Sequence, residues 1–189
     1  RHQETTPATG ALNPRPLDSL MTTPAVIHSV HNAAPRYGVV GDIYAFVLTG
    51  EQTGGAFALI DALVFPNAGP PPHTHSREDE TFIVLEGRLA FTAGGRTFSA
   101  GPGETVHLPR GHTHTFTNPT DRPARALIHC APAGIENMFR EIGTPLPPAE
   151  TTLSSSTPPA PPPPVTPEII QKILAAAPRY GITIHPPAT

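Results

Sequence analysis

The stretch Gly69–Gly87, GPPPHTHSREDETFIVLEG, carries two histidines and a glutamate at a spacing that suits one shared site. His73 and His75 are two residues apart, and side chains two apart in a β-strand point to the same side. The polar segment after them favours a turn, and the apolar run that follows predicts a second strand with Glu80 at its start. Two imidazoles and a carboxylate on adjacent antiparallel strands form most of a site for a divalent transition metal.

A second stretch, Gly103–Asn118 (GETVHLPRGHTHTFTN), adds a third histidine. The tight turn Pro109–Gly111 reverses the chain, so His114 begins a strand that can face the first three ligands. Three imidazoles and one carboxylate leave room for water or substrate on a six-coordinate ion. The predicted ligands of this ion are His73, His75, Glu80 and His114.

The two stretches resemble the paired motifs of the cupin family. The second matches the pattern G-x5-P-x-G-x2-H-x3-N at every fixed position. The first matches G-x5-H-x-H-x4-E-x6-G, except that Gly69 stands closer to His73 than the pattern asks. The resemblance implies an all-β fold, a small antiparallel jelly-roll barrel (double-stranded β-helix) with the metal inside.

The layout around the motifs is similar to that of single-barrel bacterial cupins of the quercetin 2,3-dioxygenase type, over residues 38–146. This resemblance implies that a small enolic or aromatic, flavonol-like substrate binds the metal through an oxygen. Glu80 would take its proton, and dioxygen would attack the activated carbon. The ion would be Ni, Mn, Co, Fe or Cu, because the ligand set does not choose among them, and Zn could displace it. The alternatives are a metal-dependent isomerase or lyase that does not use oxygen, and a non-enzymatic small-molecule-binding cupin.

Side chains close to the motifs are candidates for a substrate pocket. Phe82 is the first of them, because it lies two residues from Glu80 and so shares its strand face. Phe116 is a second aromatic candidate. His112 lies two residues before His114, from where it could also donate a hydrogen bond behind a metal ligand.

Two neighbouring features have plainer interpretations. The charged segment Arg77–Asp79 between the first two strands is interpreted as a solvated turn. Cys130, the single cysteine of the chain, is interpreted as a small buried residue that cannot form an internal disulfide. One cysteine fits a reducing compartment, so we expect a cytoplasmic protein.

Length and charge limit the possible partners. The chain has 189 residues, enough for one domain with a sizeable core. Its net charge of −3 favours neither nucleic acid nor an anionic membrane surface, and no apolar run is long enough to span a bilayer. We expect a small-molecule substrate and dioxygen as partners. Open strand edges also predict a homodimer, which light scattering would measure.

Four segments are expected along the chain. Residues 1–24 are polar and contain prolines, which indicates a disordered arm or an artificial leader. Residues 25–143 should form the barrel and a short helix packed on it. Residues 144–165 are rich in proline and serine and should form an extended linker. Residues 166–189 should form a helix capped by Thr166 and a short strand, docked on this barrel or on a partner subunit.

Overall fold

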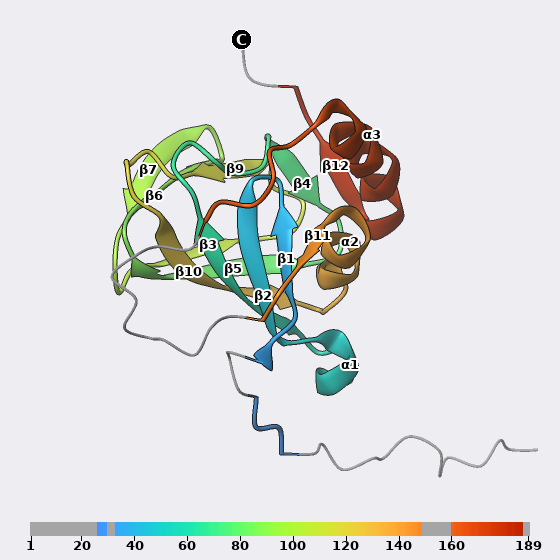
Figure 1. The fold of residues 1–189 in the computed structure, drawn as a ribbon. Coiled ribbons are helices and arrows are strands. Elements are labelled where there is room, and N and C mark those ends of the chain that lie inside the picture. The colour runs from blue at the N-terminus through green and yellow to red at the C-terminus, as the bar shows by residue number, and fades with distance from the viewer. Residues whose placement is uncertain (1–25, 30–32, 149–159, 187–189) are drawn as a thin grey trace, which may run out of the picture.

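Two antiparallel sheets pack against each other in the computed structural model, which describes residues 26–29, 33–148 and 160–186 (Figure 1). The larger, seven-stranded sheet has the order β11 (Thr144–Leu146), β1 (Arg36–Val39), β2 (Asp42–Leu48), β3 (Ala58–Val64), β10 (Ala124–Ala131), β5 (Asp79–Glu86), β8 (Thr105–Leu108). The five-stranded sheet has the order β12 (Ile182–Ile184), β4 (His73–His75), β9 (His114–Thr117), β6 (Leu89–Ala93), β7 (Arg96–Ala100). The expected all-β barrel is confirmed, while the expected arm, residues 1–24, lies outside the described residues.

The core lies between the sheets and is built by strict alternation along the strands. Every second residue of β10 is buried, beginning with Ala124. In β5 the inner face carries Glu80 and Phe82. The ring of Phe82 lies 5.2 Å from that of Phe91 on β6 and 5.0 Å from that of Phe116 on β9, so it joins the two sheets. Because Glu80 shares this inner face, its carboxylate must point into the barrel.

Three α-helices and one 3-10 helix accompany the strands in the described part of the chain. α1 (Gly50–Thr53) connects β2 to β3, and η3 (Ala177–Tyr180) follows α3. The helix expected after the barrel is confirmed as α2 (Ile135–Ile142), which buries Ile135, Met138 and Ile142. The expected tail helix is α3 (Pro167–Ala176), where the hydroxyl of Thr166 accepts a hydrogen bond from the backbone N–H of Ile169. None of the described helices is long and apolar enough to cross a membrane.

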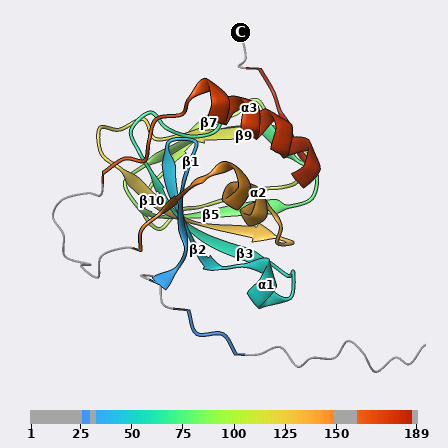
Figure 2. The same ribbon diagram turned by 45° about the vertical axis from the view of Figure 1, so that its right-hand side comes forward.

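The C-terminal segment, residues 160–186, docks on the chain's own barrel. β12 extends the smaller sheet by pairing with β4, so that Ile182 lies opposite His75 and Ile184 opposite His73. Tyr180 donates a 2.9 Å hydrogen bond to Glu141 of α2. Figure 2 shows α3 alongside α2. The tail is thus an integral part of the fold.

The expected linker, residues 144–165, starts later than the sequence indicated. Its first residues form β11, which pairs with β1 through Thr144 opposite Gly38. Pro145 is compatible with a strand here because β11 lies at the edge of its sheet, where a missing N–H breaks no ladder. The proline-rich composition of this segment did not indicate a strand pairing. Residues 149–159 of the expected linker lie outside the described residues.

Candidate metal centre

The structure brings the four predicted ligands together inside the barrel. Their side chains come from β4, β5 and β9, and β4 pairs with β9 through His73 opposite His114. One ligand atom from each residue lies within 4.8 Å of all the others. All four residues are buried, at 7% exposure or less: His73, His75, Glu80 and His114.

Asn118, the last residue of the second motif, positions the loop that leads into β4. Its buried side-chain amide donates to the carbonyl oxygens of Val64 at 2.8 Å and Arg122 at 2.7 Å. Its backbone carbonyl accepts from the N–H of Asn67 at 2.9 Å. Asn118 is therefore a structural residue, which fixes the approach of the chain to His73.

The same loop explains the departure from the first motif. The pattern leaves five residues between its glycine and His73, which places that glycine at the position of Asn67. Asn67 has a φ of 60°, in the left-handed region that asparagine tolerates better than most residues. A Cβ on Gly69 would collide with the backbone carbonyl of Phe116. The chain thus meets the backbone requirement with Asn67 and uses Gly69 for close approach to β9.

Hydrogen bonds behind two of the histidines orient their rings. Nδ1 of His73 lies 2.9 Å from the carbonyl oxygen of Pro71, and Nδ1 of His114 lies 3.0 Å from that of His112. A carbonyl only accepts, so each Nδ1 carries the proton and each Nε2 of the neutral ring turns a lone pair to the centre. This tautomer is the one that a metal ligand requires.

The carboxylate completes the centre. Oε2 of Glu80 lies 3.1 Å from Nε2 of His114 and 3.8 Å from Nε2 of His75. Nitrogen and oxygen ligands bind such ions at about 2.0–2.2 Å and then stand roughly 3–4 Å apart. The cluster therefore fits a divalent transition metal with only small side-chain movements.

The electrostatics of the cluster also suit a cation. Burial lowers the pKa of His73 to about 4. Burial would by itself raise the pKa of Glu80, but the neighbouring imidazoles of His75, His114 and His73 lower it to about 2. At neutral pH, His73 is therefore neutral and Glu80 is ionised. Those are the protonation states in which imidazole and carboxylate bind metals.

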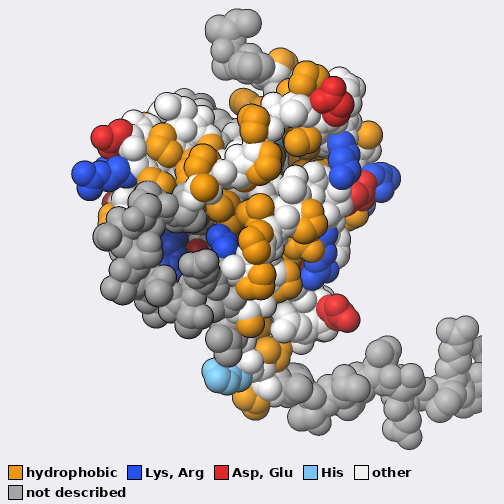
Figure 3. Space-filling model, in the orientation of Figure 1, with side chains coloured by type: hydrophobic (Ala, Val, Ile, Leu, Met, Phe, Trp, Pro, Cys, Tyr) orange, Lys and Arg blue, Asp and Glu red, His pale blue; other side chains and the backbone are white. Residues whose placement is uncertain are grey.

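A cavity of about 860 Å³ opens from this cluster. Three of the ligands, His73, His75 and Glu80, form its polar end. Its apolar walls come from β1, α2 and the C-terminal segment, and hydrophobic side chains gather over this face of the molecule (Figure 3). The walls contributed by α2 and the C-terminal segment include Ile135, Met138, Phe139, Ile142, Ile170, Ile173, Leu174, Ile182 and Ile184.

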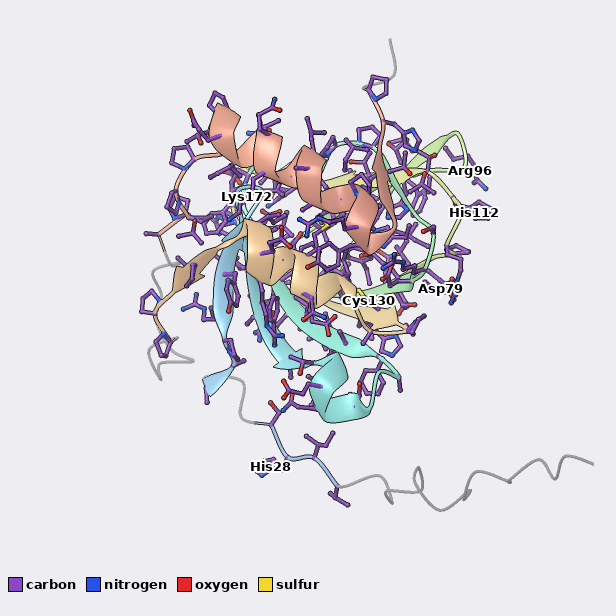
Figure 4. The ribbon with its side chains drawn as sticks, turned by 90° about the vertical axis from the view of Figure 1, so that its right-hand side faces the viewer. His28, Asp79, Arg96, His112, Cys130 and Lys172 are labelled. Carbon is purple, nitrogen blue, oxygen red and sulfur yellow. The ribbon has the colours of Figure 1, made fainter. Side chains whose placement is uncertain are left out.

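The structure places the predicted pocket residues differently from one another. Phe116 lines the cavity. Phe82 is fully buried in the core and does not line it, because Phe91 and Phe116 enclose its ring. His112 is exposed, at the periphery in Figure 4, and contributes only its backbone carbonyl, which holds His114.

Several residues near the centre escaped the sequence analysis or were misjudged by it. Tyr44, on β2, lines the cavity. The sequence could have indicated that it points inward, because Tyr44 and Phe46 are two residues apart and share one face of the strand. The prediction of a solvated turn is wrong for Glu78, which is 2% exposed. Cys130 is buried as predicted, and its thiol donates a 3.7 Å hydrogen bond to Oε1 of Glu80.

Comparisons with known proteins agree with this architecture. Residues 62–130 match the cupin domain model Cupin_2. The chain is 26% identical over 110 residues to quercetin 2,3-dioxygenase of Bacillus subtilis. The aligned region covers 58% of this chain and 28% of that enzyme. It is 29% identical over 101 residues to a beta-D-galactosidase of Mycobacterium tuberculosis, covering 52% of this chain and 87% of that protein.

A solved structure supports the fold alone. A "predicted oxalate decarboxylase" from Thermotoga maritima superposes with a TM-score of 0.51 at 17% identity, covering 56% of this chain and 98% of that one. The paired motifs, the two-sheet barrel and the domain match lead to one assignment. Residues 62–130 match the cupin family, and the described residues form a single barrel of the cupin type around a buried cluster of three histidines and a glutamate.

Proposed function

We propose that this chain is a metal-dependent dioxygenase that acts on a small, uncharged enolic or aromatic substrate such as a flavonol. The observation that carries the proposal is the opening of a buried three-histidine, one-glutamate cluster onto an apolar cavity. An ion bound there would reach a substrate that the apolar walls hold away from water. A planar aromatic molecule with one ionisable hydroxyl suits both ends of this cavity.

The cavity walls argue against charged substrates. No lysine or arginine is found among the described residues that line the cavity. Sugar phosphates and dicarboxylates are normally held by such cations through charge-assisted hydrogen bonds. An anion buried here would lack a counter-charge other than the metal itself, and burying an unpaired charge is costly.

The same lining argues against glycoside hydrolysis. Among the described lining residues, Glu80 is the single carboxylate. Most glycoside hydrolases need a pair of carboxyl groups on either side of the scissile bond. A sugar would also leave most of its hydroxyl groups against apolar walls, without hydrogen-bond partners.

Glu80 has the position and the charge of a general base. A divalent ion held by the four ligands would supply Lewis acidity that lowers the pKa of a substrate hydroxyl, and a means of activating dioxygen. Glu80 lines the cavity and is ionised at neutral pH, so it can accept the proton of that hydroxyl. The transfer is easiest from a hydroxyl that a bound ion has made more acidic than a free phenol.

The test is oxygen uptake by protein loaded in turn with Ni, Mn, Co, Fe(II) or Cu. We expect a flavonol to be consumed together with dioxygen for at least one of these metals. The matched flavone, which lacks the enolic hydroxyl, should not react. Conversion in the absence of oxygen would instead indicate an isomerase or lyase, and flavonol binding without any conversion would indicate a binding protein.

A further inference from the structure

Glu78, in the turn between β4 and β5, is a buried carboxylate close to the metal centre. It is 2% exposed, and its Oε2 lies 3.5 Å from Nδ1 of His75. Neither of these two atoms has a hydrogen-bond partner among the described residues. Burying a carboxylate oxygen without a hydrogen bond is costly, and within the described part of the chain the contact with His75 is the interaction that can offset the cost for Oε2.

Glu136 shows what a structural buried glutamate looks like in this fold. It is 1% exposed, but one carboxylate oxygen accepts from the backbone N–H of Gly50 and the other from that of Gly134, both at 2.8 Å. These bonds join α1 to the start of α2. Among the described residues no backbone N–H donates to Glu78, and its Oε2 is directed at an imidazole instead.

The three histidines of the centre differ in what lies behind them. His73 and His114 each direct Nδ1 at the backbone carbonyl two residues earlier in the chain. His75 directs Nδ1 at the carboxylate of Glu78. Its Nε2 faces Glu80 on the other side of the ring, as the Nε2 of His114 does.

We propose that Glu78 is a positioning residue that accepts the Nδ1–H of His75 and makes His75 the strongest imidazole donor of the centre. The proposal rests on the metal-binding part of the proposed function. A carboxylate behind a ligating histidine fixes the tautomer and raises the basicity of the nitrogen that binds the metal. A carbonyl oxygen does this more weakly because it carries no full charge.

The test measures the affinity for Co²⁺ alone, by competition with a chromophoric chelator, and records the visible spectrum of the Co²⁺-loaded protein. Glu78→Gln keeps the shape of the side chain, and Glu78→Leu removes its polarity. Asp79→Asn is the matched control, because Asp79 is the adjacent acid but pairs with Arg110 on the surface at 2.9 Å. Thermal unfolding of each protein in excess chelator shows whether the fold is retained.

We expect Glu78→Gln to weaken Co²⁺ binding on the order of 10- to 100-fold, Glu78→Leu at least as much, and Asp79→Asn less than twofold. The spectrum at full occupancy should change in the Glu78 variants, which a purely structural role would not cause. Wild-type affinity and spectrum in Glu78→Gln would overturn the proposal, as would an equal loss in Asp79→Asn. A wild type that binds no Co²⁺ would overturn it together with the metal-dependent function, whereas tight binding without oxygen uptake would remove the dioxygenase assignment alone.

Discussion

Strand β4 lies between two regions that differ in chemistry and in how their sequence encodes them. On one side is the motif region, where β9 and β5 supply His114 and Glu80. On the other side is the C-terminal segment, residues 160–186, where β12 pairs with β4. The first region, together with β4, contains every predicted ligand, whereas the second supplies apolar walls such as Ile173 and Ile182.

This difference separates the candidate metal centre from the apolar walls of the cavity. The ligands follow from short-range rules: alternation along a strand, one turn, and a second motif. The walls of the C-terminal segment follow from a pairing between strands that are far apart in the sequence. The metal ligands and many of the cavity walls therefore come from parts of the chain that can be altered separately.

Loss of a motif ligand should have the largest effect. Wild-type protein should carry close to one divalent transition metal per chain, and His75→Ala should lose most of it, because alanine puts no donor atom in the place of one of the three imidazoles. Elemental analysis of the purified proteins measures this. His107→Ala is the matched control, since His107 is exposed and bonds to Thr81 on the outer face. Equal metal content in wild type and His75→Ala would contradict the assignment of the centre.

Glu80→Gln should have the next largest effect, on turnover. The amide cannot take up a proton, while His73, His75 and His114 should retain a substantial part of the metal. We expect turnover per bound metal to fall about 10²-fold or more, the usual contribution of a positioned base. Glu86→Gln on the same strand is the control, because the side chain of Glu86 is 68% exposed. If Glu80→Gln equals wild type per metal, Glu80 is a ligand and has no role as a base.

The centre could be predicted from the sequence because each motif depends on local rules, and the resemblance to the cupin family implied that the two motifs meet in one barrel. His73 and His75 share a strand face by alternation, and the turn before His114 is encoded by Pro109 and Gly111. What could not be predicted depends on distant contacts. Glu78 lies in a run of charged residues typical of surface turns, and only the packed barrel shows that it is enclosed behind His75.

The same reason explains the pocket. Phe82 and Phe116 each lie two residues after a predicted ligand, but of the two only Phe116 lines the cavity. Alternation along a strand predicts which face a side chain lies on, and does not predict how deep in the barrel it lies. The position of the C-terminal segment depends on the pairing of β12 with β4 and on the contact between Tyr180 and Glu141. The sequence predicted that this helix and strand dock, but it left open whether they dock on this barrel or on a partner subunit.

Deletion of Thr166–Thr189 should destabilise the barrel and weaken metal binding to a smaller degree than His75→Ala. The deletion removes the buried residues Ala176, Ala177 and Ile182 and leaves β4 with an unpaired edge. A loss of about 3–5 kcal/mol would lower the melting temperature by roughly 6–20 °C for a chain of this size. Differential scanning calorimetry and Co²⁺ titration measure the two effects.

If the deletion variant does not fold, a point variant can test the role of the C-terminal segment. Ile173→Ala shortens a cavity wall in α3, whereas Gln171→Ala changes an exposed position of the same helix. Only Ile173→Ala should weaken flavonol binding, and Co²⁺ affinity should be unchanged in both. An unchanged melting temperature on deletion, or equal flavonol binding by the two point variants, would show that the C-terminal segment is an appendage and that the comparison is wrong.

The smallest effect concerns Asp42 on β2, which belongs to neither region. Its side chain is fully buried, one oxygen accepts from the N–H of Phe65 at 3.0 Å, and the other has no hydrogen-bond partner among the described residues. Burial raises its pKa from 3.8 to about 8, although the bond from Phe65 opposes this. Between these two values the folded state keeps a proton that the unfolded state has released. Stability should therefore fall as the pH rises from about 4 to about 8 and then level off.

Asp42→Asn cannot ionise and keeps an acceptor for Phe65, so it should flatten this part of the stability profile. We expect its melting temperature to approach that of wild type near pH 4 and to exceed it by a few degrees near pH 8, measured in excess chelator so that metal binding does not contribute. Asp121→Asn, at an exposed position, should follow wild type throughout. Parallel profiles for wild type and Asp42→Asn would show that Asp42 is not protonated in the folded barrel. A pH dependence of the melting temperature that is seen only with metal bound would then arise from the metal ligands of the motif region and not from Asp42.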